Sequence, residues 1–351
     1  MTIYIILLFV VLFSIFLETT FTKINIKNFE MKSRDLSFFV CFVFIFLLGV
    51  MRKEDLGVDV DAYKSYFLYT YSSLNIKFFI GNFNYDFGYV ILNKIVGLFT
   101  DNFRIFEIII YCISFGIFST IVYKESRYPA LSFLIYIGLE FIGFNMCILR
   151  QSVACALCFA AYYYLERNKK LKYIGLVVIA ILFHKTAVFF LLTYLLSWKR
   201  NEVKSYKYSF GLILLFFVGF NLVLPLLYGI YNNDYSNMVV SGQGYKLLLF
   251  YIVTVLIISL IIKNNSSNKE IMQYKCSSGA MYIQTGALSF ALFTRITKYF
   301  AILFTLSIPN IVYRSKYKKI YIMVYSIMFS ILYIYGLYSN EMEVVPYKLF
   351  I

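Results

Sequence analysis

Five cationic side chains interrupt or border the long apolar runs of this sequence. They are Arg52, Arg150, Lys185, Arg295 and Lys298. Guanidinium groups bind phosphate oxygens in pairs and stay charged at any cellular pH. The membrane topology described below places all five on one side, where they suit an anionic lipid-linked ligand such as pyrophosphate. The alternatives are plain loop cations and, for Arg150, a side chain that extends to the membrane interface.

The single histidine and two aspartates could supply acid–base chemistry. His184 lies in the middle of an apolar stretch, and imidazole has an ordinary pKa of about 6.5, which suits a general base. Asp59 and Asp61, which follow Gly57, are the competing bases. The alternatives are a hydrogen-bonded packing role for His184 and a solvated loop in which Asp61 caps a helix.

The elements that must position these residues are membrane helices. The chain has 351 residues, 61% of them hydrophobic and 15% charged, whereas soluble domains are about 45–50% apolar. The apolar residues form long runs, and a helix needs roughly 20 of them to cross a bilayer. The net charge of +15 indicates basic loops that fix topology, with some contacts to anionic lipid, and not a nucleic-acid surface.

We therefore predict an all-α polytopic membrane protein with about ten transmembrane helices. The predicted spans are 3–21, 36–51, 105–123, 129–146, 147–165, 208–230, 246–262, 279–294, 297–313 and 320–338. Residues 87–100 are short and carry polar side chains, so they are predicted to form an interfacial helix. Residues 173–197 have basic clusters at both ends, and a single crossing would place one cluster outside. A re-entrant helical hairpin with its turn near His184 resolves this conflict, provided that its backbone faces protein or a wet cavity.

With an interfacial helix at 87–100 and a hairpin at 173–197, the basic loops lie on the cytoplasmic side. The same assignment places residues 52–104, the 145–151 and 295 corners, the 231–245 loop and both termini on the extracytoplasmic side. With only 4 Pro and no Gly/Ser-rich linker, residues 1–351 are expected to form a single transmembrane domain. The N-terminal run is expected to be a retained span. No metal-ligand pattern surrounds the histidine, and a CxxC within a membrane helix favours packing, so we expect neither metal nor cofactor.

The polar residues also match a known family pattern. The matching residues are Arg52, Gly57-Val58-Asp59, Tyr63, Phe67, Asp86-Phe87-Gly88-Tyr89, Leu92-Asn93, Asn145, Leu149-Arg150-Gln151, Leu182-Phe183-His184-Lys185, Ala187, Arg295, Tyr299-Phe300, Pro309 and Pro346-Tyr347. In these positions the chain resembles the EpsG family of Wzy-type bacterial polysaccharide polymerases. The Leu-Arg-Gln and Phe-His-Lys segments are the specific part. This chain has Asp86 where the family more often has Glu. Both side chains are carboxylates, so the charge is retained.

The resemblance implies an architecture similar to membrane-embedded GT-C-like polymerases and ligases. It also implies a reaction that joins oligosaccharide repeat units carried on undecaprenyl pyrophosphate, at the outer face of the bacterial cytoplasmic membrane. The product would be capsule, exopolysaccharide or O-antigen. Such enzymes use no nucleotide sugar and often no metal, so an inverting, metal-independent transfer is expected. A flippase and a chain-length regulator are the expected protein partners.

Roles for individual residues follow from the resemblance and the chemistry together. The predicted pyrophosphate contacts are Arg150, Arg295, Arg52, Lys185 and Lys298. His184 is slightly preferred as the base over Asp59 and Asp61. The predicted sugar contacts are Gln151 and Asn145, which would orient hydroxyls, and Tyr63 and Tyr299, which would stack on rings.

Three other functions compete with the polymerase. A glycan ligase usually has a large external loop late in the chain, whereas the 231–245 loop is short. A flippase for lipid-linked sugar tends to have two pseudo-repeated halves, and this sequence has no such self-similarity. A membrane scaffold would not need a histidine beside a re-entrant turn.

Overall fold

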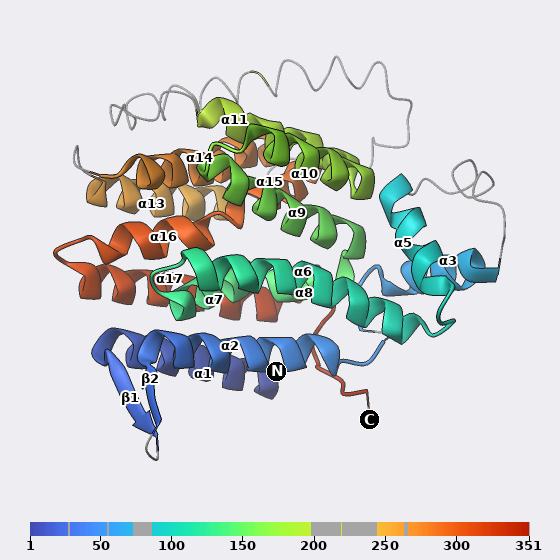
Figure 1. Ribbon diagram of the computed structural model, residues 1–351, viewed down its shortest axis with the longest axis horizontal. Helices are drawn as coiled ribbons and strands as arrows, with labels where there is room; N and C mark the ends of the chain where they lie inside the picture. The colour runs from blue at the N-terminus through green and yellow to red at the C-terminus, as the bar shows by residue number, and fades with distance from the viewer. Residues whose placement is uncertain are drawn as a thin grey trace. The chain divides into compact units, whose positions relative to one another are not determined.

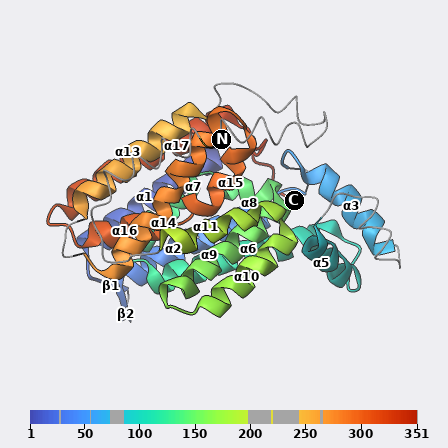
Figure 2. The same ribbon diagram turned by 90° about the horizontal axis from the view of Figure 1, so that it is seen from above.

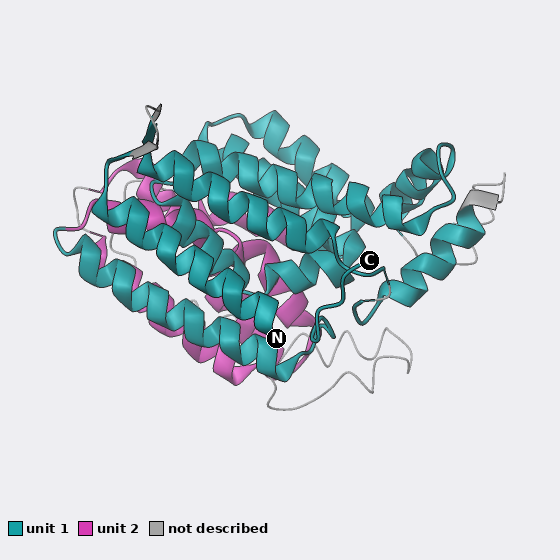
Figure 3. Cartoon of the chain, turned by 90° about the horizontal axis from the view of Figure 1, so that it is seen from below, with its two compact units in different colours: residues 1–188, 316–351 teal, residues 189–315 magenta. Residues whose placement is uncertain are grey.

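The computed structural model describes residues 1–26, 29–54, 56–72, 86–197, 219, 244–262 and 266–350. These residues contain 15 α-helices and one two-stranded sheet. They divide into two compact units, one of residues 1–188 and 316–351 and the other of residues 189–315, coloured separately in Figure 3.

The first unit is built mainly from helices that run side by side (Figure 1). They are α1 Thr2–Thr20, α2 Ser33–Val50, α3 Val60–Ser72, α5 Phe87–Gly97, α6 Phe103–Glu125, α7 Pro129–Gly138, α8 Phe141–Cys147, α9 Leu149–Glu166, α10 Lys170–Phe183 and α17 Lys318–Ser339. Strands β1 Lys23–Ile26 and β2 Phe29–Lys32 form an antiparallel hairpin between α1 and α2. Helix α9 packs against both α6 and α10, and α7 packs against α17.

Local sequence explains several helix ends in this unit. The Asn102 side chain caps α6 by accepting from the backbone N–H of Arg104 at 2.9 Å, as expected of asparagine at an N-cap. Pro129 occupies the first turn of α7, where its missing N–H costs nothing. Asn168 adopts a φ of 58° between α9 and α10, a left-handed conformation that asparagine tolerates.

The C-terminal residues fold back along the first unit. The backbone N–H of Lys53 donates to the carbonyl of Lys348 at 2.8 Å, and the Tyr4 hydroxyl donates to the carbonyl of Val344 at 3.0 Å. The Tyr347 hydroxyl donates to the carbonyl of Leu48 at 2.9 Å. Burial raises the pKa of Tyr347, so this hydroxyl stays protonated and remains a donor at neutral pH. The tail thereby joins α1 and the end of α2.

The second unit contains shorter helices. They are α11 Leu192–Leu196, α13 Tyr245–Ile261, α14 Asn268–Gln284, η3 Thr285–Leu288, α15 Leu292–Ala301 and α16 Phe304–Tyr313. Helix α14 begins at a capping box in which Ser267 and Glu270 bond to each other's backbone N–H groups. It packs against α13, α15 and α16, and nearly all of its residues are buried.

Four predicted spans are confirmed as long apolar helices, namely α1, α2, α6 and α17. Among the described residues the number able to cross a membrane rises to six only if two bent pairs count as spans. These pairs are α7 with α8, bent by 61°, and α15 with α16, bent by 40°. The predicted total of ten is not confirmed, and the span at 208–230 lies almost wholly outside the described residues, as does the 231–245 loop.

The prediction of one continuous span at 279–294 is wrong. Helix α14 ends at Gln284, a short 3₁₀ turn follows, and α15 begins at Leu292. A side chain at Gly286 would lie 2.7 Å from the Phe293 ring, so the absence of one allows the chain to pack tightly at this bend. Hydropathy alone does not reveal such a break, because apolar residues continue on both sides of it.

The segment predicted as a re-entrant hairpin is interrupted where its turn was expected. Helix α10 ends at Phe183, and His184 has extended backbone angles of φ −158° and ψ 116°. A 3₁₀ helix, η1 Lys185–Leu191, follows and crosses the boundary between the two units. The hairpin itself stays a prediction, as does the single domain over 1–351.

Candidate functional site

Three charged or ionisable side chains of the first unit meet at one carboxylate oxygen. Asp86 Oδ2 lies 3.3 Å from Nη1 of Arg150 and 3.5 Å from Nδ1 of His184. The Asp86 side chain is only 7% exposed, whereas those of Arg150 and His184 are 22% and 21% exposed. We call these three residues the Asp86 triad. A buried carboxylate thus holds two partly accessible groups, one able to bind anions and one able to transfer a proton.

Each member of the triad lies at a helix end. Asp86 is the N-cap residue of α5, and its backbone carbonyl accepts from the N–H of Tyr89 at 3.0 Å. Its side chain makes no capping bond, so the carboxylate is directed to its tertiary partners. Arg150 is the second residue of α9, just after a break at Ile148. His184 directly follows α10.

A glycine brings α5 and α10 into direct contact beside the triad. A Cβ atom at Gly88 would lie 2.9 Å from the carbonyl oxygen of Leu182 and 3.1 Å from the ring of Phe183. Since Gly88 is two residues after Asp86 and Leu182 is two before His184, this close approach sets the distance between the two functional side chains. Only a residue without a side chain allows it.

Replacing Gly88 by Ala is therefore expected to lower the activity of the site by about ten- to a hundredfold, because a displacement of about 1 Å in a reacting group can cost that much. The new methyl group would push α5 away from the α10 backbone and separate Asp86 from His184. The measurement is turnover of the purified protein. The matched control is Gly175→Ala in α10, where the added Cβ meets nothing within 4 Å. Equal turnover of the Gly88→Ala and Gly175→Ala variants would show that the contact between Gly88 and Leu182 does not position the triad.

An aromatic cluster from α3, α5 and α6 lies beside the triad. The Arg150 guanidinium lies 5.9 Å from the ring centroid of Tyr63, within cation–π range. The rings of Tyr63 and Tyr89 are 5.6 Å apart in an edge-to-face arrangement. Phe67 and Phe106 pack beneath them in the same cluster. The cluster thus holds α3 and α5 beside each other (Figure 2).

The other predicted residues of the first unit differ in how far they are buried. Asp59 is half-buried before α3, while Asp61 in its first turn and Lys185 are exposed. Gln151 is fully buried, and Asn145 donates from Nδ2 to the Tyr136 hydroxyl at 2.6 Å. Tyr63 is 4% exposed and lies under Arg150. Roles for these side chains as base, pyrophosphate contact or sugar contacts stay predictions.

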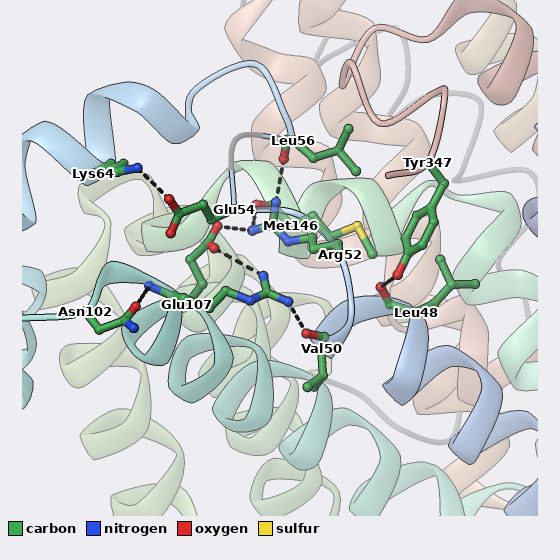
Figure 4. A network of polar contacts seen from close by, with 11 residues as sticks. Leu48, Val50, Arg52, Glu54, Leu56, Lys64, Asn102, Glu107, Met146 and Tyr347 are labelled. Atoms are coloured by element: carbon green, nitrogen blue, oxygen red, sulfur yellow. Dashed lines mark hydrogen bonds and ion pairs between the residues drawn. The ribbon is translucent and has the colours of Figure 1, made fainter. Parts of the chain in front are cut away.

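Arg52 lies in a buried polar network (Figure 4). Its guanidinium forms an ion pair with Glu107 and donates to the carbonyls of Leu56 and Met146. Arg104 binds the second oxygen of Glu107 at 3.3 Å. Because the Arg52 side chain is only 3% exposed, this geometry favours a structural role over contact with pyrophosphate.

Three predicted residues belong to the second unit and share helix α15. Arg295 is exposed and Lys298, one turn later, is 7% exposed. The Tyr299 ring is fully buried, so sugar stacking there would require it to leave the interior. The meeting of Arg295 with Arg150 stays a prediction, since the two residues belong to different units.

Asp86 is a candidate functional residue to which the sequence analysis assigned no role. It appeared only as a conservative difference in a family pattern, and Asp59 and Asp61 were considered as bases instead. The available signal was an acidic residue directly before an apolar helix that begins Phe-Gly-Tyr. Within the described part of the chain, no group of three or more His, Cys, Asp or Glu side chains is placed to hold a metal ion.

Comparison with known proteins agrees with the sequence pattern. The family profile described as the EpsG family matches residues 36–349, and hence all three segments that carry the Asp86 triad. No curated protein and no solved structure matches the chain. The match covers nearly the whole sequence, so the chain is a member of the EpsG family, a family of Wzy-type polysaccharide polymerase-like proteins.

Proposed function

We propose that this protein polymerises oligosaccharide repeat units carried on undecaprenyl pyrophosphate, at the outer face of the bacterial cytoplasmic membrane. The growing chain would move from its lipid pyrophosphate to the non-reducing end of a new lipid-linked unit. The observation that carries the proposal is the Asp86 triad, which pairs a candidate base with a candidate pyrophosphate ligand at one carboxylate. Family membership supplies the reaction class.

His184 is the proposed general base. Asp86 faces Nδ1 of the imidazole, an arrangement that favours a proton on Nδ1 and leaves Nε2 to accept one from the acceptor hydroxyl. The carboxylate also stabilises the imidazolium formed when that proton arrives. Asp86 acts through His184, so it is a positioning residue in this scheme.

Arg150 is the proposed ligand of the departing pyrophosphate. The acceptor oxygen would attack the anomeric carbon from the face opposite the leaving group, so the bond to pyrophosphate breaks with inversion. A guanidinium has five N–H donors, so Arg150 can keep its bond to Asp86 while others meet phosphate oxygens. Fixed positive charge at the leaving oxygen lowers the barrier to its departure. Lys185, which is exposed in the first unit, is the proposed additional cation.

The direct test is conversion of purified lipid-linked repeat units by the purified protein, with and without a chelator. We expect polymer in both conditions and no polymer with His184→Ala. Deletion in cells should leave single repeat units on lipid at the outer face. Retention of those units at the inner face would favour a flippase, and attachment of finished glycan to another acceptor would favour a ligase.

A further inference from the structure

Two arginines and one glutamate form a buried cluster in the first unit, away from solvent. We call Arg52, Arg104 and Glu107 the Arg52 cluster; their side chains are 3%, 6% and 2% exposed. Each arginine pairs with one oxygen of Glu107. Arg104 also donates to the carbonyl of Val50 at the end of α2. Buried charges are tolerated only when their partners are in place, so the cluster fixes the geometry of the backbone that it binds.

Arg52 joins the two segments that lead to the proposed site. One N–H group donates to the carbonyl of Leu56, just before the turn into α3, and another donates to the carbonyl of Met146 at 2.8 Å. Met146 lies four residues before Arg150, on the other side of the helix break at Ile148. The carbonyls at the end of α8 need hydrogen-bond donors from outside the helix, and the Arg52 guanidinium supplies one to Met146.

The same two segments touch each other directly. Gly57 has a φ of 127°, and a Cβ built there would lie 2.4 Å from Sγ of Cys147. The N–H of Val58 and the thiol of Cys147 both donate to the carbonyl of Met342, at 3.3 and 3.1 Å. The turn into α3 and the α8–α9 junction are thus packed together, with Arg52 bridging them on one side and the C-terminal tail on the other.

We infer that Arg52 is a positioning residue for the proposed polymerase reaction and not a ligand of its pyrophosphate. By holding the turn before α3 against the α8–α9 junction, it keeps Arg150 over the ring of Tyr63 and within reach of Asp86. Glu107 and Arg104 hold the Arg52 guanidinium from α6. The expected effect of replacing Arg52 on turnover rests on the proposed function. Its expected effect on the packing of the α8–α9 junction does not.

Cys147 provides a reporter that is independent of polymer formation. It is fully buried at the junction, and Cys158 is fully buried farther along α9. Single-cysteine proteins that keep only Cys147 or only Cys158 are treated with a maleimide in detergent. Local opening of the junction would expose Cys147 alone, whereas unfolding of α9 would expose both.

Two variants test the inference. Arg52→Lys keeps the positive charge, but an ammonium cannot bind both carbonyls as the planar guanidinium does. Glu107→Gln removes the carboxylate that pairs with Arg52, and it alters no residue that could contact the lipid-linked sugar donor. We expect each to speed labelling of Cys147 by about tenfold or more and to lower kcat by about ten- to a hundredfold, with Cys158 still protected. The control Arg34→Lys alters an arginine that binds the carbonyls of Tyr123 and Ser126 and an adjacent Asp35, and should change neither measurement.

Two outcomes would overturn the inference. If Cys147 stays protected in Arg52→Lys while the KM for the lipid-linked donor rises, Arg52 contacts the donor directly. If Cys158 is labelled as fast as Cys147, the cluster maintains the helix as a whole and not the junction. Should the wild-type protein form no polymer, the proposed function fails, but the labelling of Cys147 still decides whether Arg52 holds the junction.

Discussion

Asp86→Asn is expected to reduce polymer formation by about a hundred- to ten-thousandfold, because general acid–base catalysis contributes that much and depends on the orientation of the base. The amide keeps the size of the side chain but removes the charge that faces Nδ1 of His184 and Nη1 of Arg150. It would therefore neither stabilise the imidazolium nor hold the guanidinium in place.

The measurement is kcat of the purified variant with lipid-linked repeat units, together with its melting temperature. Asp35→Asn is the matched control, since Asp35 also pairs with an arginine, Arg34, at 3.0 Å, and should retain turnover. Normal polymer from Asp86→Asn, with a loss in Asp59→Asn or Asp61→Asn, would place the base at the start of α3 and reject the triad.

Arg150→Ala is expected to lower kcat by about a hundred- to a thousandfold, the usual effect of removing one group that stabilises developing negative charge. Arg150→Lys should recover only part of this loss. An ammonium is a point charge, so it cannot bind Asp86 and two phosphate oxygens in one plane. Both variants should yield short chains or single units in cells.

Chain-length distribution in cells and kcat of the purified proteins check this expectation. Arg167→Lys is the control. Arg167 is the C-cap residue of α9; it pairs with Glu125, and its guanidinium lies 3.6 Å from the ring centroid of Tyr163. Full-length polymer made by Arg150→Ala would show that Arg150 does not bind the departing pyrophosphate. This result would not depend on the role of His184.

The positions of many helices could be predicted from the sequence, because they depend on local properties such as hydropathy and charge. Long apolar runs predicted α1, α2, α6 and α17, since the bilayer imposes a minimum length on each crossing. The break near His184 was predicted from the basic clusters on either side of residues 173–197, and α10 does end there. The error at 279–294 arose where a bend depends on a tight contact, that of Gly286 with Phe293.

The candidate site was predictable in part. Arg150 and His184 were identified because charged or ionisable side chains within apolar sequence require a reason to be there. Their common partner was not identified, since the position of Asp86 before an apolar helix does not reveal which distant side chains it meets. Arg52 was singled out by its type as a pyrophosphate contact, but its burial beside Glu107 could be known only once α2 and α6 had been packed together.

The sequence by itself thus determined that the chain is a helical membrane protein with cations and one histidine between its apolar segments, because hydropathy and charge act over a single helix length. Only the tertiary structure decided which charges meet. Asp86, Arg150 and His184 belong to three separate stretches of chain, and they converge because the Gly88 backbone can touch α10 while α9 begins anew at Ile148. Electrostatic and hydrogen-bond partners must lie within a few ångströms of each other, and distances of that kind are set by helix packing.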